Sequence, residues 1–269
     1  MRKFLSAAIA GLVFFASCKK EGKEPEFNRN DLAPLSIEFD NIVGGTNLYL
    51  NSTTYTNAAG EDYAISLLQY YVSNIKVYKA DGTEYVVPQD CSYFLIKEGD
   101  VASGSALVNV PEGDYSRLVF TLGVDSLRST MDVDRRTGVL DPASGMDEGM
   151  YWGWNSGYIF FKMEGLSAAA PVDGSGQNKF RYHIGGFGGY SAPTINNIKE
   201  ISIDLSQAGV AKVRKERKSN IHLMADIAKV MNGPTILSIA ANPTVMFSEF
   251  SANIAANYAT MFSHDHTEN

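Results

Sequence analysis

The sequence predicts an all-β protein: a single antiparallel β-sandwich-like domain with long loops and a C-terminal helix. Its 269 residues include 14 Tyr, 14 Phe and 24 Gly, a composition typical of strands joined by tight turns. Apolar and polar residues alternate with the period of a half-buried strand, most clearly over residues 73–78. Asp81-Gly82 then supplies the strongest short hairpin signal. Such segments recur about every 10–15 residues, which favours a sandwich.

The individual strands follow from the same alternation. They are expected at residues 35–39, 47–50, 73–78, 85–87, 92–97, 105–110, 115–122, 158–164, 180–184, 199–205 and, as the last strand, 220–227. Residues 63–71 fit either a strand or one short helix. Near the end, Phe250, Ile254 and Tyr258 recur at helical spacing, with Ser251 as a plausible N-cap. We therefore expect a helix that covers one end or face of the sheets.

Residues 123–150 interrupt this pattern. They carry several Asp and Glu among Gly, Ser, Thr and Pro, and no period holds, so we expect a long loop. Loops of this length in compact domains are usually functional. The carboxylates offer a calcium site, although they lack the ligand ladder and the closing Glu of an EF-hand.

The first residues are predicted to be a targeting segment. Residues 1–17 have a basic start followed by an apolar stretch too short to span a bilayer, as in a signal peptide. Small residues precede Cys18, as in the lipobox of bacterial lipoproteins, so Cys18 is expected to carry the lipid. Residues 18–34 read as the lipidated Cys and a flexible tether, and residues 35–269 as the domain. These features predict a protein anchored to the bacterial cell envelope, at the outer membrane or the periplasmic face.

Charge and motifs exclude several functions. The net charge is −7, so the surface as a whole does not attract nucleic acid. The basic run at 212–218 is interpreted as a strand edge protected by charge. No helix pattern follows the Gly-rich segment 185–189, and no G-x-S-x-G or H-E-x-x-H motif occurs, so we expect no enzyme activity.

The four histidines are the more informative residues. His264 and His266 are two apart and in extended backbone would point the same way, an arrangement that suits copper or zinc. His183 is expected at a strand end, where it could meet the terminal segment. His222 is expected in mid-strand among apolar neighbours and is assigned no role. The prediction is a metal site of His183 with His264 or His266; a polar C-terminus and a structural His183 explain the same residues without a metal.

Both tryptophans, Trp152 and Trp154, fall within residues 149–158 together with two Tyr. This concentration suits a core plug or a stacking platform. The alternative function is therefore a cell-surface lipoprotein module that binds glycan or protein through an aromatic loop.

An ordered set of motifs resembles the MbnP-like copper-binding proteins. It consists of Tyr70–Ile75, Gly123–Ser126, Leu140–Pro142, Gly145-Met146, Met150–Tyr158, Glu164-Gly165, His183–Gly186 and Met261–His266. The resemblance runs over about residues 35–266, nearly the whole chain after the tether. The specificity of the resemblance lies in the order of the set.

The resemblance implies a β-rich extracytoplasmic protein that binds copper for uptake or handling. Family members act beside a di-haem partner of the MbnH type, related to cytochrome c peroxidases, which can oxidise a Trp to kynurenine at or near the metal. Trp152 and Trp154 are the candidates here, and His183 matches the family's His before Ile-Gly-Gly. Copper(I) favours imidazole and thioether ligands, which also makes Met150 a near-metal candidate.

Overall fold

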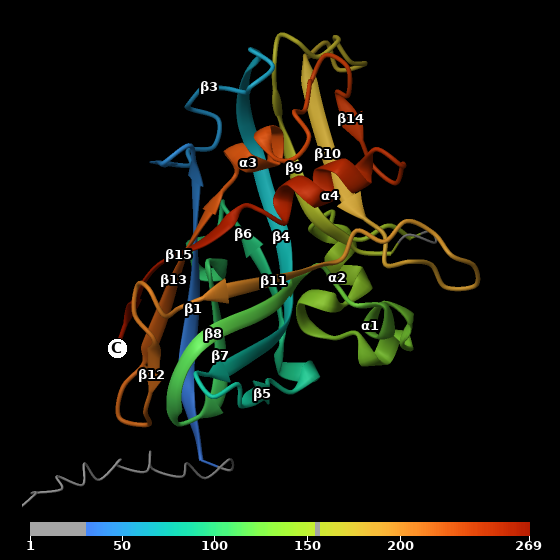
Figure 1. Cartoon of the computed structure of the whole chain (residues 1–269). Coiled ribbons are helices and arrows are strands. Elements are labelled where there is room, and N and C mark those ends of the chain that lie inside the picture. Colours follow the sequence, from blue (N-terminus) through green and yellow to red (C-terminus); the bar gives the residue numbers. More distant parts are fainter. Residues whose placement is uncertain (1–30, 154–156) are drawn as a thin grey trace, which may run out of the picture.

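The structure, a computed structural model, describes residues 31–153 and 157–269 as two curled sheets packed face to face (Figure 1). The five-stranded sheet has the order β15 (Phe262–Glu268), β13 (Ser219–Asp226), β1 (Leu32–Val43) and β2 (Thr46–Asn47), and β7 (Ser105–Pro111) also pairs with β1. Strands β1 and β13 run parallel, whereas β15 is antiparallel to β13. The prediction of an all-β sandwich-like domain is confirmed.

The second sheet has ten strands. Its order is β11 (Lys199–Asp204), β8 (Gly113–Leu122), β4 (Asp62–Lys79), β9 (Ile159–Leu166), β10 (Lys179–Gly185) and β14 (Thr244–Val245); β12 (Ala211–Val213) pairs with β8, and β3 (Tyr55–Thr56), β5 (Glu84–Val86) and β6 (Tyr93–Lys97) pair with β4. All of these pairs are antiparallel except β10 with β14. The long strand β4 is therefore the spine of this sheet.

Burial on both faces explains why residues 63–71 were ambiguous in the sequence. Within β4, Tyr70 lies in the main core between the sheets, and its neighbour Tyr71 lies in a second, smaller core on the opposite face. Both side chains are fully buried. A strand that is buried on both faces loses the alternation of apolar and polar residues, so its period cannot distinguish it from a buried helix.

The helices are short. They are α1 (Ser126–Thr130), α2 (Pro142–Asp147), α3 (Ala228–Asn232) and α4 (Ser251–Tyr258), with 3₁₀ turns η1 (Gln89–Cys91), η2 (Val101–Ser103), η3 (Val133–Arg135) and η4 (Gly138–Leu140). The C-terminal helix is confirmed, but its N-cap is Phe250; Ser251 is the first helical residue, buried, and accepts a hydrogen bond from Asn197. None of the helices formed by the described residues has the length and hydropathy of a membrane span.

Two sequence expectations are corrected by the topology. The segment 123–150 is not an unbroken loop, because it contains α1, α2, η3 and η4. The strand expected at 220–227 is not the last, because the chain leaves α4 and returns to the five-stranded sheet as β15, beside β13. The edge strand β15 is largely exposed, so it lacks the apolar face by which strands were recognised.

Candidate metal-binding sites

The two ends of the tryptophan motif, residues 150–153 and 157–159, pair antiparallel beside the ten-stranded sheet, and we call this pair the Trp152 hairpin. The Trp152 N–H donates to Gly157 O (2.8 Å), and the Ile159 N–H donates to Met150 O (2.8 Å). Met150 is fully buried in the second core, and Trp152 packs partly buried against that core. Trp154 lies outside the described residues. The hairpin therefore holds Trp152 in one place over the sheet rather than in a free loop.

Gly185 lets this hairpin approach β10. A methyl group at Gly185 would come within 2.4 Å of Tyr158 O and 2.9 Å of Trp152 Cζ3, both far inside van der Waals contact. Only glycine leaves room for the indole ring here. His183 lies two residues earlier on the same strand. It faces the hairpin, because Lys162, opposite it on β9, donates to Gly149 O at the start of the hairpin.

His183 is part of a charged network on this face. Its Nε2 lies 2.7 Å from Glu164 Oε1, and Lys162 Nζ lies 3.7 Å from the same oxygen. The Lys162 ammonium also donates to Gly149 O (3.1 Å), at the base of the Trp152 hairpin. The hydrogen bond from His183 is the main influence that holds the pKa of Glu164 below its usual range, against the opposing effect of burial. Glu164 is thus ionised at neutral pH, and it fixes the proton of His183 on Nε2.

The terminal histidines are separated by a β-bulge. In the pairing of β13 with β15, His222 lies opposite His266 and Leu223 lies opposite His264, which leaves Asp265 as an extra residue. Because adjacent residues of β13 face opposite sides, His264 and His266 also face opposite sides. The expectation that they point the same way is therefore wrong. His264 Nε2 contacts Thr267 Oγ1 (2.9 Å), and burial lowers the pKa of His264.

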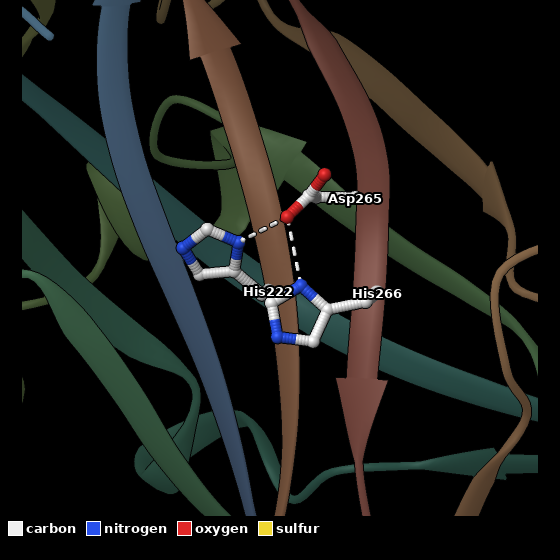
Figure 2. A group of neighbouring side chains, drawn as sticks. All are labelled: His222, Asp265 and His266. Carbon is white, nitrogen blue, oxygen red and sulfur yellow. Dashed lines mark hydrogen bonds and ion pairs between the residues drawn. The ribbon is translucent and has the colours of Figure 1, made fainter.

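The same bulge brings His222, Asp265 and His266 together. One oxygen of Asp265 lies 3.1 Å from His222 Nδ1 and 2.7 Å from His266 Nδ1, as Figure 2 shows. The two imidazole rings are 4.9 Å apart between centroids and inclined by 41°. Hydrogen bonds from His266 and His222 lower the pKa of Asp265, and the hydrogen bond to Asp265 raises the pKa of His266. Among the described residues, these three form a group whose ligand atoms all lie within 4.8 Å of one another.

The structure does not bring His183 to the terminal segment. His183 is on β10 of the ten-stranded sheet, whereas His264 and His266 are on β15 of the other sheet, and Figure 1 shows these strands well apart. Two members of the cluster, His222 and Asp265, were not among the ligands predicted from the sequence. The alternation along β13 could have indicated that His222 faces outward. The bulge that turns Asp265 toward His222 has no signal in the sequence.

Within 123–150, Asp125 and Asp141 are engaged separately rather than gathered around one point. Asp125 accepts hydrogen bonds from Tyr93 (2.5 Å), Asn74 (2.9 Å) and the Arg128 N–H (2.9 Å). Asp141 accepts from the Ala143 N–H at the start of α2. In the part of the chain that the structure describes, these side chains form no group of three ligands. Cys18, the expected lipidation site, lies outside the described residues.

Comparison with known proteins identifies relatives by fold and by family. The MbnP family model matches residues 33–247 of the chain. The solved structure of MbnP from Methylosinus trichosporium superposes with a TM-score of 0.54 at 15% sequence identity, covering 81% of this chain and 82% of that one. At this identity the likeness is one of fold. A search of curated proteins found no significant match.

Proposed function

The chain belongs to the MbnP family, and from this we propose that it is an extracytoplasmic copper-binding protein, held to the bacterial cell envelope by a lipid on Cys18, that serves in copper uptake or handling. The observation that supports the proposal is the position of the Trp152 ring against Gly185, two residues from His183 on β10. Two of the motifs, Met150–Tyr158 and His183–Gly186, thus meet at one place in the fold.

His183 is the residue proposed to hold copper. A metal-binding imidazole usually donates a hydrogen bond from its second ring N–H to a carboxylate, and this bond fixes the tautomer and the orientation of the ring. Glu164 is this carboxylate for His183, with its Oε1 2.7 Å from Nε2. Nδ1 is therefore the ring nitrogen that can bind the metal. Copper(I) accepts imidazole and thioether donors at low coordination number and would act here as the bound cargo. The neutral imidazole nitrogen of His183 is a donor that suits such an ion.

Copper(I) titration tests this assignment. We expect the full chain to compete with a colorimetric copper(I) chelator, and His183→Ala to weaken the affinity at least about tenfold, because the imidazole supplies the main donor. Glu164→Gln should weaken it less, since the ligand remains but loses its orientation. His264→Ala, a histidine on the other sheet, is the control. Equal copper(I) affinity in wild type and His183→Ala would exclude this site.

The proposed partner is a di-haem protein related to cytochrome c peroxidases, acting on Trp152 or Trp154. Co-expression with such a partner should raise the intact mass by about 4 Da, which is the conversion of Trp to kynurenine by gain of two oxygens and loss of the formyl group, a net gain of one oxygen and loss of one carbon. Trp152→Phe and Trp154→Phe, compared side by side, identify the modified residue. An unchanged mass in the wild type would count against this step.

The proposed anchor is tested by cell fractionation. Acyl chains on Cys18 contribute about 0.8 kcal/mol for each buried CH₂, so two or three chains hold a protein stably in the membrane. Wild type should therefore enter the detergent phase, and Cys18→Ala should be released or remain unprocessed. A wild type that is soluble without detergent would contradict the lipid anchor.

A further inference from the structure

We propose that His222, Asp265 and His266 form a second metal site, for a divalent first-row transition ion, on the outer face of the five-stranded sheet. Two imidazole nitrogens and one carboxylate oxygen lie within 4.8 Å of one another there. The site uses none of the residues assigned to copper(I) at His183 and stands on its own geometry.

The backbone builds this arrangement. A regular strand would turn Asp265 and His266 to opposite faces of the sheet. The bulge leaves Asp265 unpaired between His264 and His266, and its carboxylate turns to the face where His222 and His266 lie side by side. Bulges commonly re-aim a side chain in this way and are enriched next to functional sites. The extra residue has a definite consequence, since it adds the third ligand.

The side chains converge before any ion arrives. Both Nδ1 atoms are directed at the same Asp265 oxygen, at 3.1 Å and 2.7 Å (Figure 2). Bonds from a zinc ion to histidine or carboxylate are about 2.0–2.2 Å, so an ion that replaces the shared protons draws the three atoms together by a short movement. His222 comes from a central strand with 16% of its side chain exposed, whereas Asp265 and His266 are 42% and 48% exposed. The ion therefore has an open approach from solvent.

The surrounding charges favour a cation. Glu268 Oε1 lies 3.7 Å from His266 Nε2, and Glu38 lies opposite His222 on the neighbouring strand β1. Imidazole and carboxylate together suit borderline ions, with affinity rising toward copper(II) and zinc(II) among the divalent first-row metals. Three protein ligands leave at least one coordination position for water or another donor, as in open zinc sites.

Zinc titration of the full, untagged chain tests the site. We expect one equivalent of zinc(II) to bind, and His222→Ala and His266→Ala each to weaken that binding at least about tenfold, because each removes one of three ligands. The matched control is His264→Ala, two residues from His266 but on the opposite face, which should bind like the wild type. Equal zinc affinity in all four proteins would overturn the proposal, as would a loss confined to His264→Ala.

Ring NMR gives an independent readout. One equivalent of zinc(II) should shift the imidazole signals of His222 and His266 and leave those of His183 unchanged. Movement of the His183 signal alone would overturn the proposal. Thermal unfolding of the metal-free variants shows whether any lost affinity reflects lost structure. Since the copper(I) titration is followed with His183→Ala and the zinc(II) titration with His222→Ala, failure of one proposal leaves the other testable.

Discussion

His183 and His222 occupy equivalent positions, each pointing outward from a strand with a neighbour on both sides, yet their surroundings differ. His183 is a single imidazole bonded to Glu164, which also pairs with Lys162, next to a hairpin that packs on the second core. His222 shares an exposed carboxylate with a second imidazole and needs only one extra residue in β15. The first site requires about thirty-five residues of covering segment, from α1 to the end of the hairpin, and the second requires a bulge. Metal binding at His183 should therefore depend on the packing of the covering segment, and metal binding at His222 on the local geometry of its ligands.

The largest effect should come from closing the space under Trp152. Gly185→Ala forces a methyl group against Tyr158 O and the indole ring, and overpacking of this kind costs about 3 kcal/mol. Denaturant unfolding should show this loss, and copper(I) binding should fall, while zinc(II) binding at His222 stays unchanged. Gly153→Ala is the control, since a methyl group there meets no atom within 4 Å. Equal losses of copper(I) and zinc(II) affinity in Gly185→Ala would show that the regions around His183 and His222 are not independent.

A smaller effect is expected where the covering segment is anchored. Asp125 joins α1 to strands β4 and β6 through its bonds with Asn74 and Tyr93. Burial, the strongest influence, raises the pKa of Asp125, but its hydrogen bonds together outweigh burial and lower the pKa. Asp125→Asn should therefore cost about 1–2 kcal/mol at pH 7.

The pH dependence of that cost has a defined sign. A lowered pKa in the folded state adds stability above the unfolded value of about 3.9, and this stability is lost as the pH falls through the folded pKa. The difference between wild type and Asp125→Asn should be constant from pH 7 to about pH 5 and shrink below about pH 4. The exposed Asp134, in the same segment, gives the control Asp134→Asn. A difference that grows in acid would contradict the lowered pKa.

The smallest effect on stability is expected at the bulge. Asp265→Ala should change the unfolding free energy of the metal-free chain by less than about 0.5 kcal/mol, because the side chain is largely exposed. It should still weaken zinc(II) binding, since a ligand is lost. The NMR titration midpoint of His266 should also fall, because Asp265 holds the pKa of His266 above its ordinary value.

The sign for His266 is opposite to that for Asp125. A raised folded-state pKa adds stability that is fully present below the unfolded value of about 6.5 and is lost as the pH rises through the folded pKa. Any excess in the unfolding free energy of wild type over that of Asp265→Ala should therefore decrease as the pH rises above the folded-state pKa of His266. An unchanged midpoint for His266 in Asp265→Ala would contradict the contact with Asp265.

The strands were predictable where one face is buried and the other is exposed to solvent. Residues 73–78 alternate cleanly and lie within the observed strand β4. Strand β15 was missed because an exposed edge strand carries little apolar pattern, and Tyr70-Tyr71 was ambiguous because both faces of β4 are covered. Periodicity reports a contrast between the faces of an element, so it fails when the faces are alike.

The sequence by itself determined the all-β class, the C-terminal helix and the resemblance to the MbnP family, whose model matches residues 33–247. It also supplied His183, His264 and His266 as candidate ligands, whereas His222 was given no role. Only the tertiary structure decided which of them meet, because β10 and β15 belong to different sheets and the bulge at Asp265 reverses the alternation between His264 and His266. Strand order and register arise from contacts between residues that are far apart in the sequence, and a single extra residue moves a side chain to the other face of a sheet.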